Sequence, residues 1–142
     1  MAKFRGRDDI GIGIQIPFGP GRSNFKLNYT TLDQARTNII NLLLTHKGER
    51  FMQPAFGTNL RRFLFDQSTE RLQDAVKNEL LSTIKFWLPY VNVENIETRR
   101  TIDDINSYTI AVSITFSVTG DLREFKTVTF GFNSNGGVSV RG

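Results

Sequence analysis

The stretch YTIAVSITFSVT, residues 108–119, carries the clearest structural pattern in the chain. Threonine, serine and one alanine alternate there with apolar side chains, which are Tyr108, Ile110, Val112, Ile114, Phe116 and Val118. Successive side chains of a β-strand point to opposite faces, so this strict alternation predicts a long strand with one buried and one polar face. An antiparallel sheet with one solvated face has this pattern.

The segments around this strand predict a β-meander. Residues 91–99 form the first expected strand, and residues 124–132 form the third after a Gly-Asp turn. A polar turn at 133–137 is followed by Val138 and Val140, which can add a short tail strand. We therefore expect an antiparallel sheet of about three strands. Its first and third strands should turn inward Val91, Val93, Ile96, Val128, Phe130 and Phe132.

Three helices are expected before the sheet. The first runs from about Thr31 to His46, begins at a threonine N-cap and stops before Gly48. A short amphipathic helix is expected at 57–65, and a long one at 69–88 with Ser68 as N-cap. The apolar arc of the first helix covers about 200°, so one flank either completes the core or packs against a partner. The sequence therefore predicts an α+β fold in which three helices pack on one face of the meander.

Residues 1–29 differ from the rest, because they are rich in glycine and proline and show no helical period. Within them Ile10, Ile12, Ile14 and Ile16 alternate with glycine and glutamine, which predicts an extended strand with one apolar face. We expect an extended N-terminal arm that docks on its own domain, on a neighbour, or on both. The expected organisation is therefore an arm at 1–29 and a single α+β domain at 30–142.

Composition excludes several classes of protein. The chain has 142 residues, 39% of them hydrophobic, so it can bury the core of one domain. It has no cysteine, which excludes disulfides and thiolate metal sites. The formal net charge of +4 is too mild to indicate nucleic acid, and no apolar run approaches the roughly 20 residues that span a membrane. We expect neither a nucleic-acid nor a membrane partner.

Catalytic motifs are sparse, and we predict no catalytic residue, metal site or cofactor. His46 is the only histidine, and its place at a helix end favours a structural role. Acidic pairs such as Glu49 with Asp66 or Asp33 could serve a glycan hydrolase, but no spacing selects one of them. Residues 123–132 mix basic and aromatic side chains without matching an RNA-binding signature. A glycan hydrolase and a nucleic-acid-binding module remain the alternative hypotheses.

The connection between the first two expected helices reads GERFMQPAFGTNL at 48–60, and FLFD follows at 63–66. Here the chain resembles the phage baseplate wedge and sheath-initiator family, often labelled "lysozyme-like", which has a type VI secretion counterpart. The shared pattern is G-E-R, then Met, Pro, F-G, Leu, and L-F followed by an acid. The resemblance covers about residues 30–119. Gly48 permits a turn there, Pro54 stiffens the connection, and Phe51, Met52 and Phe56 are expected to anchor it to the helices.

The resemblance implies a structural subunit without enzymatic activity, placed in the tail baseplate of a virion and assembled in the host cytoplasm. It implies that the motif faces the helical core bundle of the wedge through Glu49, Arg50, Met52, Pro54, Phe56 and Gly57. Glu49 and Arg50 can equally be solvated charges, and being adjacent they need not pair with each other.

The resemblance also implies that the tail sheath protein adds strands to the sheet and arm. The expected sheath-binding residues are Ile10, Ile12, Ile14, Ile16, Val138 and Val140. Hub or tube proteins are further candidate partners. The sequence leaves open whether the arm docks in cis or in trans, and whether the source is a phage, a tailocin or a secretion system.

Overall fold

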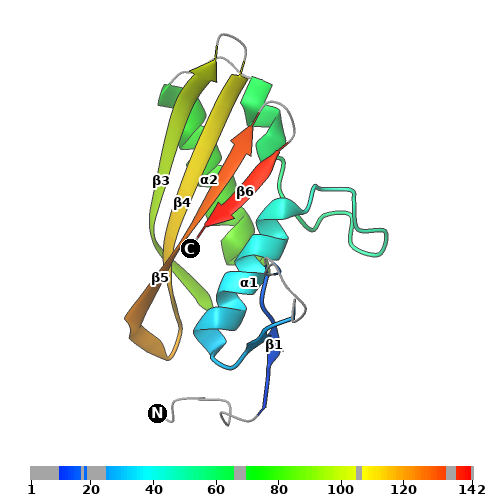
Figure 1. The fold of residues 1–142 in the computed structure, drawn as a ribbon, viewed down its shortest axis with the longest axis vertical. Coiled ribbons are helices and arrows are strands. Elements are labelled where there is room, and N and C mark those ends of the chain that lie inside the picture. The colour runs from blue at the N-terminus through cyan, green and yellow to red at the C-terminus, as the bar shows by residue number, and fades with distance from the viewer. Residues whose placement is uncertain are drawn as a thin grey trace.

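A four-stranded antiparallel sheet, in the order β3-β4-β5-β6, forms one layer of the fold (Figure 1). The computed structural model describes residues 10–16, 18, 25–65, 70–104, 107–133 and 137–141. The strands of this sheet are β3 Val91–Asp104, β4 Ser107–Val118, β5 Asp121–Asn133 and β6 Val138–Arg141. The meander is thus confirmed, the tail strand is its fourth member, and the first strand extends beyond Arg99.

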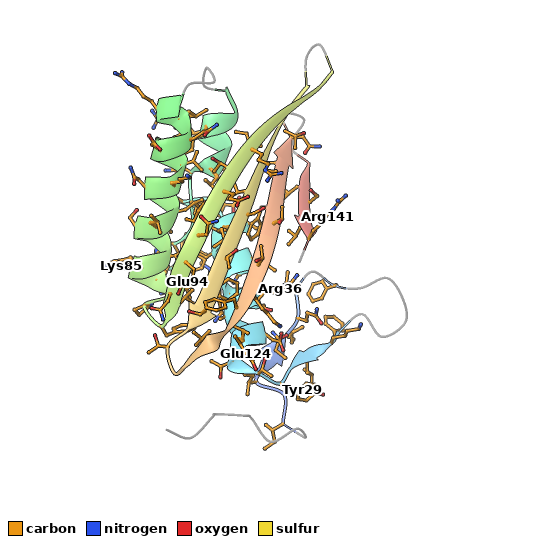
Figure 2. The ribbon with its side chains drawn as sticks, turned by 90° about the vertical axis from the view of Figure 1, so that its left-hand side faces the viewer. Tyr29, Arg36, Lys85, Glu94, Glu124 and Arg141 are labelled. Carbon is orange, nitrogen blue, oxygen red and sulfur yellow. The ribbon has the colours of Figure 1, made fainter. Side chains whose placement is uncertain are left out.

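Two α-helices, α1 Thr31–Leu44 and α2 Glu70–Trp87, cover one face of this sheet (Figure 2). The α+β class is therefore correct, but the expectation of three helices is not. Residues Leu60–Phe65 form a 3-10 helix, η1, rather than an α-helix. A segment this short gains few i→i+4 bonds, and Arg62 N donates instead to Asn59 O, three residues back, at 2.9 Å.

The ends of α1 follow local chemistry. Thr30 is the N-cap, and its hydroxyl accepts from the Asp33 backbone N–H at 3.1 Å, as expected for threonine at this position. The helix ends at Leu44, two residues earlier than expected. Thr58 explains the early end, because its N–H donates to Thr45 O at 2.9 Å and its hydroxyl to Leu43 O at 3.1 Å. Groups distant in sequence thus satisfy the last helical carbonyls.

The core lies between the helices and the inner face of the sheet. The inward parity of β4 and β5 is confirmed, since Val112, Ile114, Phe116, Val128 and Phe130 are at most 1% exposed. On β3 the register shifts between Val93 and Asn95, and the shift lets odd-numbered Val91 and even-numbered Ile96 face the same core. The helices contribute Ala35, Ile39, Ile40, Leu42, Val76, Leu80 and Ile84. Fully burying each larger side chain stabilises the fold by about 1.5–3 kcal/mol.

The N-terminal segment forms a separate two-stranded sheet beside the first half of α1. Strand β1, Gly13–Ile14, pairs antiparallel with β2, Leu27–Asn28, so the arm has a local partner that the sequence did not reveal. Backbone bonds from Ile12 N to Asn28 O and from Gln15 N to Lys26 O extend the pairing. The expected N-cap Ser68 lies outside the described residues.

Candidate partner-binding surfaces

The motif loop, residues 48–57, is closed on itself by backbone hydrogen bonds. Gly48 N donates to Pro54 O at 2.7 Å, and Gln53 N donates to Arg50 O at 3.2 Å. Gly57 has φ +112°, and a Cβ at this position would lie 2.3 Å from Thr45 O, so no other residue fits there. The glycines thus fix a compact loop that presents side chains, not unpaired backbone.

Glu49 and Arg50 turn to different partners, as their adjacency suggested. Glu49 Oε2 accepts from His46 N at 2.9 Å, next to the end of α1. The Arg50 guanidinium lies 3.9 Å from the centre of the Phe56 ring, and its NH1 donates to Gln53 Oε1 at 3.3 Å. The loop itself therefore orients the guanidinium at an exposed position.

The expectation that three apolar side chains anchor the loop is correct for one of them. Phe56 is 9% exposed and meets Trp87 of α2 edge to face, with the ring centres 5.1 Å apart. Phe51 and Met52 are instead 97% and 87% exposed. The turn between Gly48 and Pro54 is so tight that its middle residues project away from the helices. Phe51 and Met52 are therefore available to a partner.

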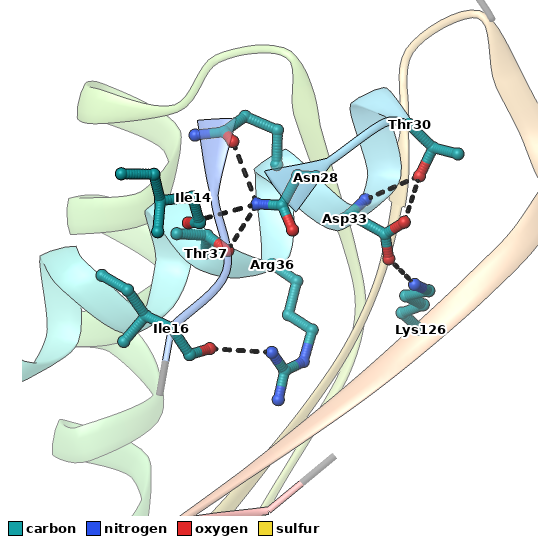
Figure 3. A network of polar contacts seen from close by, with 9 residues as sticks. Ile14, Ile16, Asn28, Thr30, Asp33, Arg36, Thr37 and Lys126 are labelled. Atoms are coloured by element: carbon teal, nitrogen blue, oxygen red, sulfur yellow. Dashed lines mark hydrogen bonds and ion pairs between the residues drawn. The ribbon is translucent and has the colours of Figure 1, made fainter. Parts of the chain in front are cut away.

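A buried polar network holds the arm against α1 (Figure 3). Asn28, 3% exposed, donates from Nδ2 to Thr37 Oγ1 at 2.9 Å and to Gln34 Oε1 at 3.0 Å. A longer contact of 3.4 Å joins Asn28 Nδ2 to Ile14 O. Arg36 NH1 donates to Ile16 O at 2.9 Å. Two of these bonds reach backbone carbonyls of the arm and two join Asn28 to side chains of α1, so polar contacts as well as apolar packing determine the position of the arm.

The isoleucines of the arm do not share one buried face. Ile10, Ile12 and Ile14 are 55%, 45% and 46% exposed, whereas Ile16 packs against the core. Gly13, between Ile12 and Ile14, faces α1, since a Cβ there would overlap the Gln34 side chain. The arm therefore docks on its own domain through glycine and backbone, and leaves three isoleucines at the surface.

Asp33 and Lys126 form an ion pair between α1 and β5 next to the arm. Burial alone would raise the pKa of Asp33, but hydrogen bonds from Lys126 and Thr30 outweigh burial and hold the pKa below its ordinary value. Burial lowers the pKa of Arg36, and the nearby Asp33 carboxylate partly offsets this effect. The Asp33 carboxylate thus stays ionised at neutral pH.

A groove with a volume of about 370 Å³ separates the arm from β5. Its walls are Gln15, Leu27, Asn28, Asp33, Arg36, Phe125, Lys126 and Thr127. Strand β6 pairs only with residues 129–132 of β5, so no described segment pairs with that edge of β5 at 124–128. The groove therefore lies beside an open stretch of sheet edge.

The structure divides the residues expected to bind the sheath into two places. The isoleucines lie near the start of α1. Val138 instead lines a small cavity with Leu43 and Leu44, the last two residues of α1. Val138 is 37% exposed and Val140 packs partly against the core. The six motif residues, by contrast, all lie on the one loop. Over the described ranges no group of three His, Cys, Asp or Glu side chains could hold a metal ion.

Two features of these surfaces were not found from the sequence. Asn28 and Arg36 join the arm to α1, and nothing in their spacing indicates the pairing. Phe86 is 74% exposed beside Trp87, and the position of Phe86 outside the apolar stripe of α2 was an available signal. Within the described residues, neither helix is long and apolar enough to span a membrane.

The fold is that of baseplate proteins from phage-type tails. A chain of the anti-feeding prophage baseplate matches with a TM-score of 0.60 and 18% identity, over 77% of this chain and 86% of that one. A chain of the pyocin R2 baseplate after contraction matches with a TM-score of 0.56 and 21% identity, over 72% of this chain and 99% of that one. A protein from Geobacter sulfurreducens, described as a putative tail lysozyme, matches with a TM-score of 0.64 and 17% identity, over 75% of this chain and 94% of that one.

The chain belongs to the family of baseplate wedge protein gp25, whose family model matches residues 30–123. The gp25 baseplate wedge protein of Enterobacteria phage T4 is 29% identical over 87 residues. That match covers 61% of this chain and 64% of the T4 protein, less than two thirds of its length. The resemblance found in the motif is thus confirmed at the level of the family.

Proposed function

We propose that this chain binds the helical core of the baseplate wedge through its motif loop, and starts the tail sheath by accepting sheath strands on its sheet. The two activities use separate surfaces. The motif loop extends from the end of α1, whereas the groove and open edge lie beside the start of α1. One small domain can therefore join two kinds of partner at the same time.

The open edge of β5 beside the groove is the observation that carries the sheath proposal. Residues 124–128 offer backbone groups that β6 does not reach, and an extended chain can pair with them by strand addition. The groove has room for side chains of that added strand. Its walls combine the aromatic ring of Phe125 with the charged groups of Arg36 and the Asp33–Lys126 pair.

The exposed isoleucines of the arm support the same proposal. Ile12, Ile14 and Leu27 are each at least 45% exposed, so the outer surface of the β1–β2 sheet is apolar. A surface of this kind favours a protein partner over water. An incoming sheath strand in the groove can therefore also bury part of the arm, which stays docked on α1 through its backbone.

The motif loop supports the wedge proposal through its side chains. Phe51 and Met52 project into solvent, and Arg50 carries a guanidinium that is already oriented over Phe56. Exposed aromatic and arginine side chains of this kind contribute most of the binding energy at many interfaces. The backbone of the loop is bonded within the loop, so recognition there uses side chains.

We also propose that the chain hydrolyses no glycan. A glycosidase needs two carboxylates on one cleft, one of them with a raised pKa. Among the described residues that line the groove Asp33 is the one carboxylate, and its pKa is lowered. Glu49 accepts from a backbone N–H at the edge of the loop, away from that groove. Purified protein should release no sugar from peptidoglycan, and release that Glu49→Gln abolishes would contradict this.

Two single substitutions test the two surfaces separately. Phe125→Glu places a charge in the groove at a side chain that is 55% exposed, so folding should be kept. Baseplates that carry it should form normally but start sheath polymerisation poorly, as measured by electron microscopy of assembled particles. Phe51→Glu, at the loop tip, is the matched control and should instead impair wedge assembly. Full sheath growth on Phe125→Glu baseplates would reject the groove as the sheath site.

A further inference from the structure

A row of stacked side chains connects the motif loop with the last turn of α2. The Arg50 guanidinium lies 3.9 Å from the centre of the Phe56 ring. Phe56 then meets Trp87 edge to face, and Trp87 meets Phe86 in the same way, with ring centres 5.1 Å apart in both pairs. Ring contacts through the buried Phe56 and the half-buried Trp87 therefore connect two elements that are distant in sequence.

Phe86, at the far end of this row, has no role in the core of the chain. Its side chain is 74% exposed, although residues of the apolar stripe on the same helix, such as Leu80 and Ile84, are fully buried. The last turn of α2 thus exposes an aromatic ring that folding does not require. At the other end of the row, Phe51 and Met52 are exposed to a similar degree. An exposed apolar surface of this extent favours contact with another protein.

The backbones of both elements are already bonded. The loop closes through Gly48 N to Pro54 O and Phe56 N to Gln53 O, and the α2 backbone is helical up to Leu88 N, which donates to Ile84 O. Neither element offers an unpaired strand edge, so the partner must bind by side-chain packing. An α-helix suits this surface, because it presents an apolar stripe and has no unpaired backbone groups of its own.

The charges around the row are basic. Within the described part of the chain, Arg50 and Lys85 form no ion pair, and both are exposed. Of the described acids on these two elements, Glu79 pairs with Lys47 at 2.7 Å and Glu49 accepts from His46 N, so both are already engaged. Two exposed cations without an ion pair among the described residues, one on each of the two elements, favour a partner that carries carboxylates on both sides of its apolar stripe.

We propose that Phe86 and Lys85 complete the docking surface of the motif loop, and that the occupant is an amphipathic α-helix of another chain with carboxylates flanking its apolar stripe. This inference rests on the proposed function, in which the motif loop binds the wedge. It adds a second element to that site, the last turn of α2, and it specifies the chemistry of the partner.

Binding of defined helical peptides tests the inference directly. The probe is a labelled amphipathic peptide of about 20 residues, long enough to be helical in water, with leucines flanked by glutamates. Fluorescence anisotropy with the full chain should show binding that weakens with added salt. Phe86→Ala and Lys85→Glu should each weaken it about tenfold or more. Leu81→Ala, at an exposed apolar residue of the same helix that lies outside both proposed sites, is the control and should leave the affinity unchanged.

Three outcomes would overturn the inference. One is equal affinity for a peptide whose glutamates are replaced by lysines. Another is parental affinity of both the Phe86→Ala and the Lys85→Glu variants. A third is a dimer in analytical ultracentrifugation that Phe86→Ala dissociates, because the occupant would then be a second copy of this chain.

Particle assembly separates failure of this inference from failure of the proposed function. If Arg50→Ala blocks wedge assembly and Phe86→Ala does not, the motif loop keeps its proposed role. The last turn of α2 is then not part of the docking surface. If Arg50→Ala has no effect either, the wedge role of the loop fails as well. The expected result is that both variants reduce the amount of this subunit in purified baseplates.

Discussion

The guanidinium of Arg50 lies over the ring of Phe56, 3.9 Å from its centre, although six positions separate the two residues. The tight turn of the motif loop brings them together, since Gln53 N bonds back to Arg50 O. Phe56 in turn is fixed against Trp87. An exposed cation is thus held in place by a buried ring, which reduces the entropy that Arg50 loses when a partner binds.

Arg50→Ala should impair wedge assembly far more than folding. The cation–π contact is exposed, so its loss should lower the free energy of unfolding by no more than about 1 kcal/mol. Thermal unfolding and the content of purified baseplates measure the two effects. Arg50→Lys keeps the charge but not the planar fork, and it should recover assembly only in part. Normal baseplate content in the alanine variant would remove Arg50 from the proposed surface.

Gly57→Ala should destabilise the fold strongly, by about 2 kcal/mol or more. The residue has φ +112°, and a Cβ would lie 2.3 Å from Thr45 O, where no flexible side chain can yield. Gly48→Ala is the matched control, since φ is +95° there but nothing lies within 4 Å of the added Cβ. The free energy of unfolding of the control should fall by only about 1 kcal/mol, because backbone strain alone acts there. Urea unfolding of both variants gives the comparison.

Asn28→Ala should loosen the arm. The substitution leaves Thr37 Oγ1 and Gln34 Oε1 without the donor they share, at a cost of about 1–3 kcal/mol. Hydrogen exchange at the amides of Ile12 and Gln15, which pair β1 with β2, should become faster than in the parent. Asn95→Ala, on the exposed face of β3, should leave both amides protected. Unchanged exchange in the Asn28 variant would mean that other contacts hold the arm.

Asp33→Asn should remove a pH-dependent part of the stability. The pKa of Asp33 is below 3.8 in the folded protein, so its contribution is present above the unfolded pKa and disappears as pH falls through the folded pKa. At pH 7 the free energy of unfolding of the parent should exceed that of the variant by at most about 1 kcal/mol, because the ion pair with Lys126 is partly exposed. Unfolding curves at several pH values should converge in acid, and a constant difference would contradict this assignment.

Deletion of residues 1–22 should leave a folded domain that starts sheath polymerisation poorly. The buried hydrophobic residues of the core begin at Leu32, so circular dichroism should show an intact fold. The deletion removes β1 and the exposed isoleucines but keeps β5 and its open edge. Normal sheath length on such baseplates would mean that the sheath does not need the arm. The Phe125→Glu variant would then test whether the groove binds the sheath without it.

Local patterns predicted those elements whose side chains alternate strictly or recur at helical spacing. Residues only a few positions apart were enough to predict the strand at 108–118, the N-cap at Thr30 and the apolar stripe of the long helix. The second expected helix failed, because the same apolar spacing suits a 3-10 turn when a segment is too short to gain α-helical bonds. The motif residues shared one loop, so they too could be predicted together.

The sequence by itself determined the α+β class, the inner face of the sheet and the motif that identifies the family, because each depends on residues close together in the chain. Tertiary structure alone decided which side chains remain exposed. Phe51 and Met52 project from the loop, Phe86 stacks on Trp87, and the arm turns glycine inward and isoleucine outward. These outcomes depend on contacts between distant segments, such as Asn28 with Thr37 and Phe56 with Trp87, which no local pattern encodes.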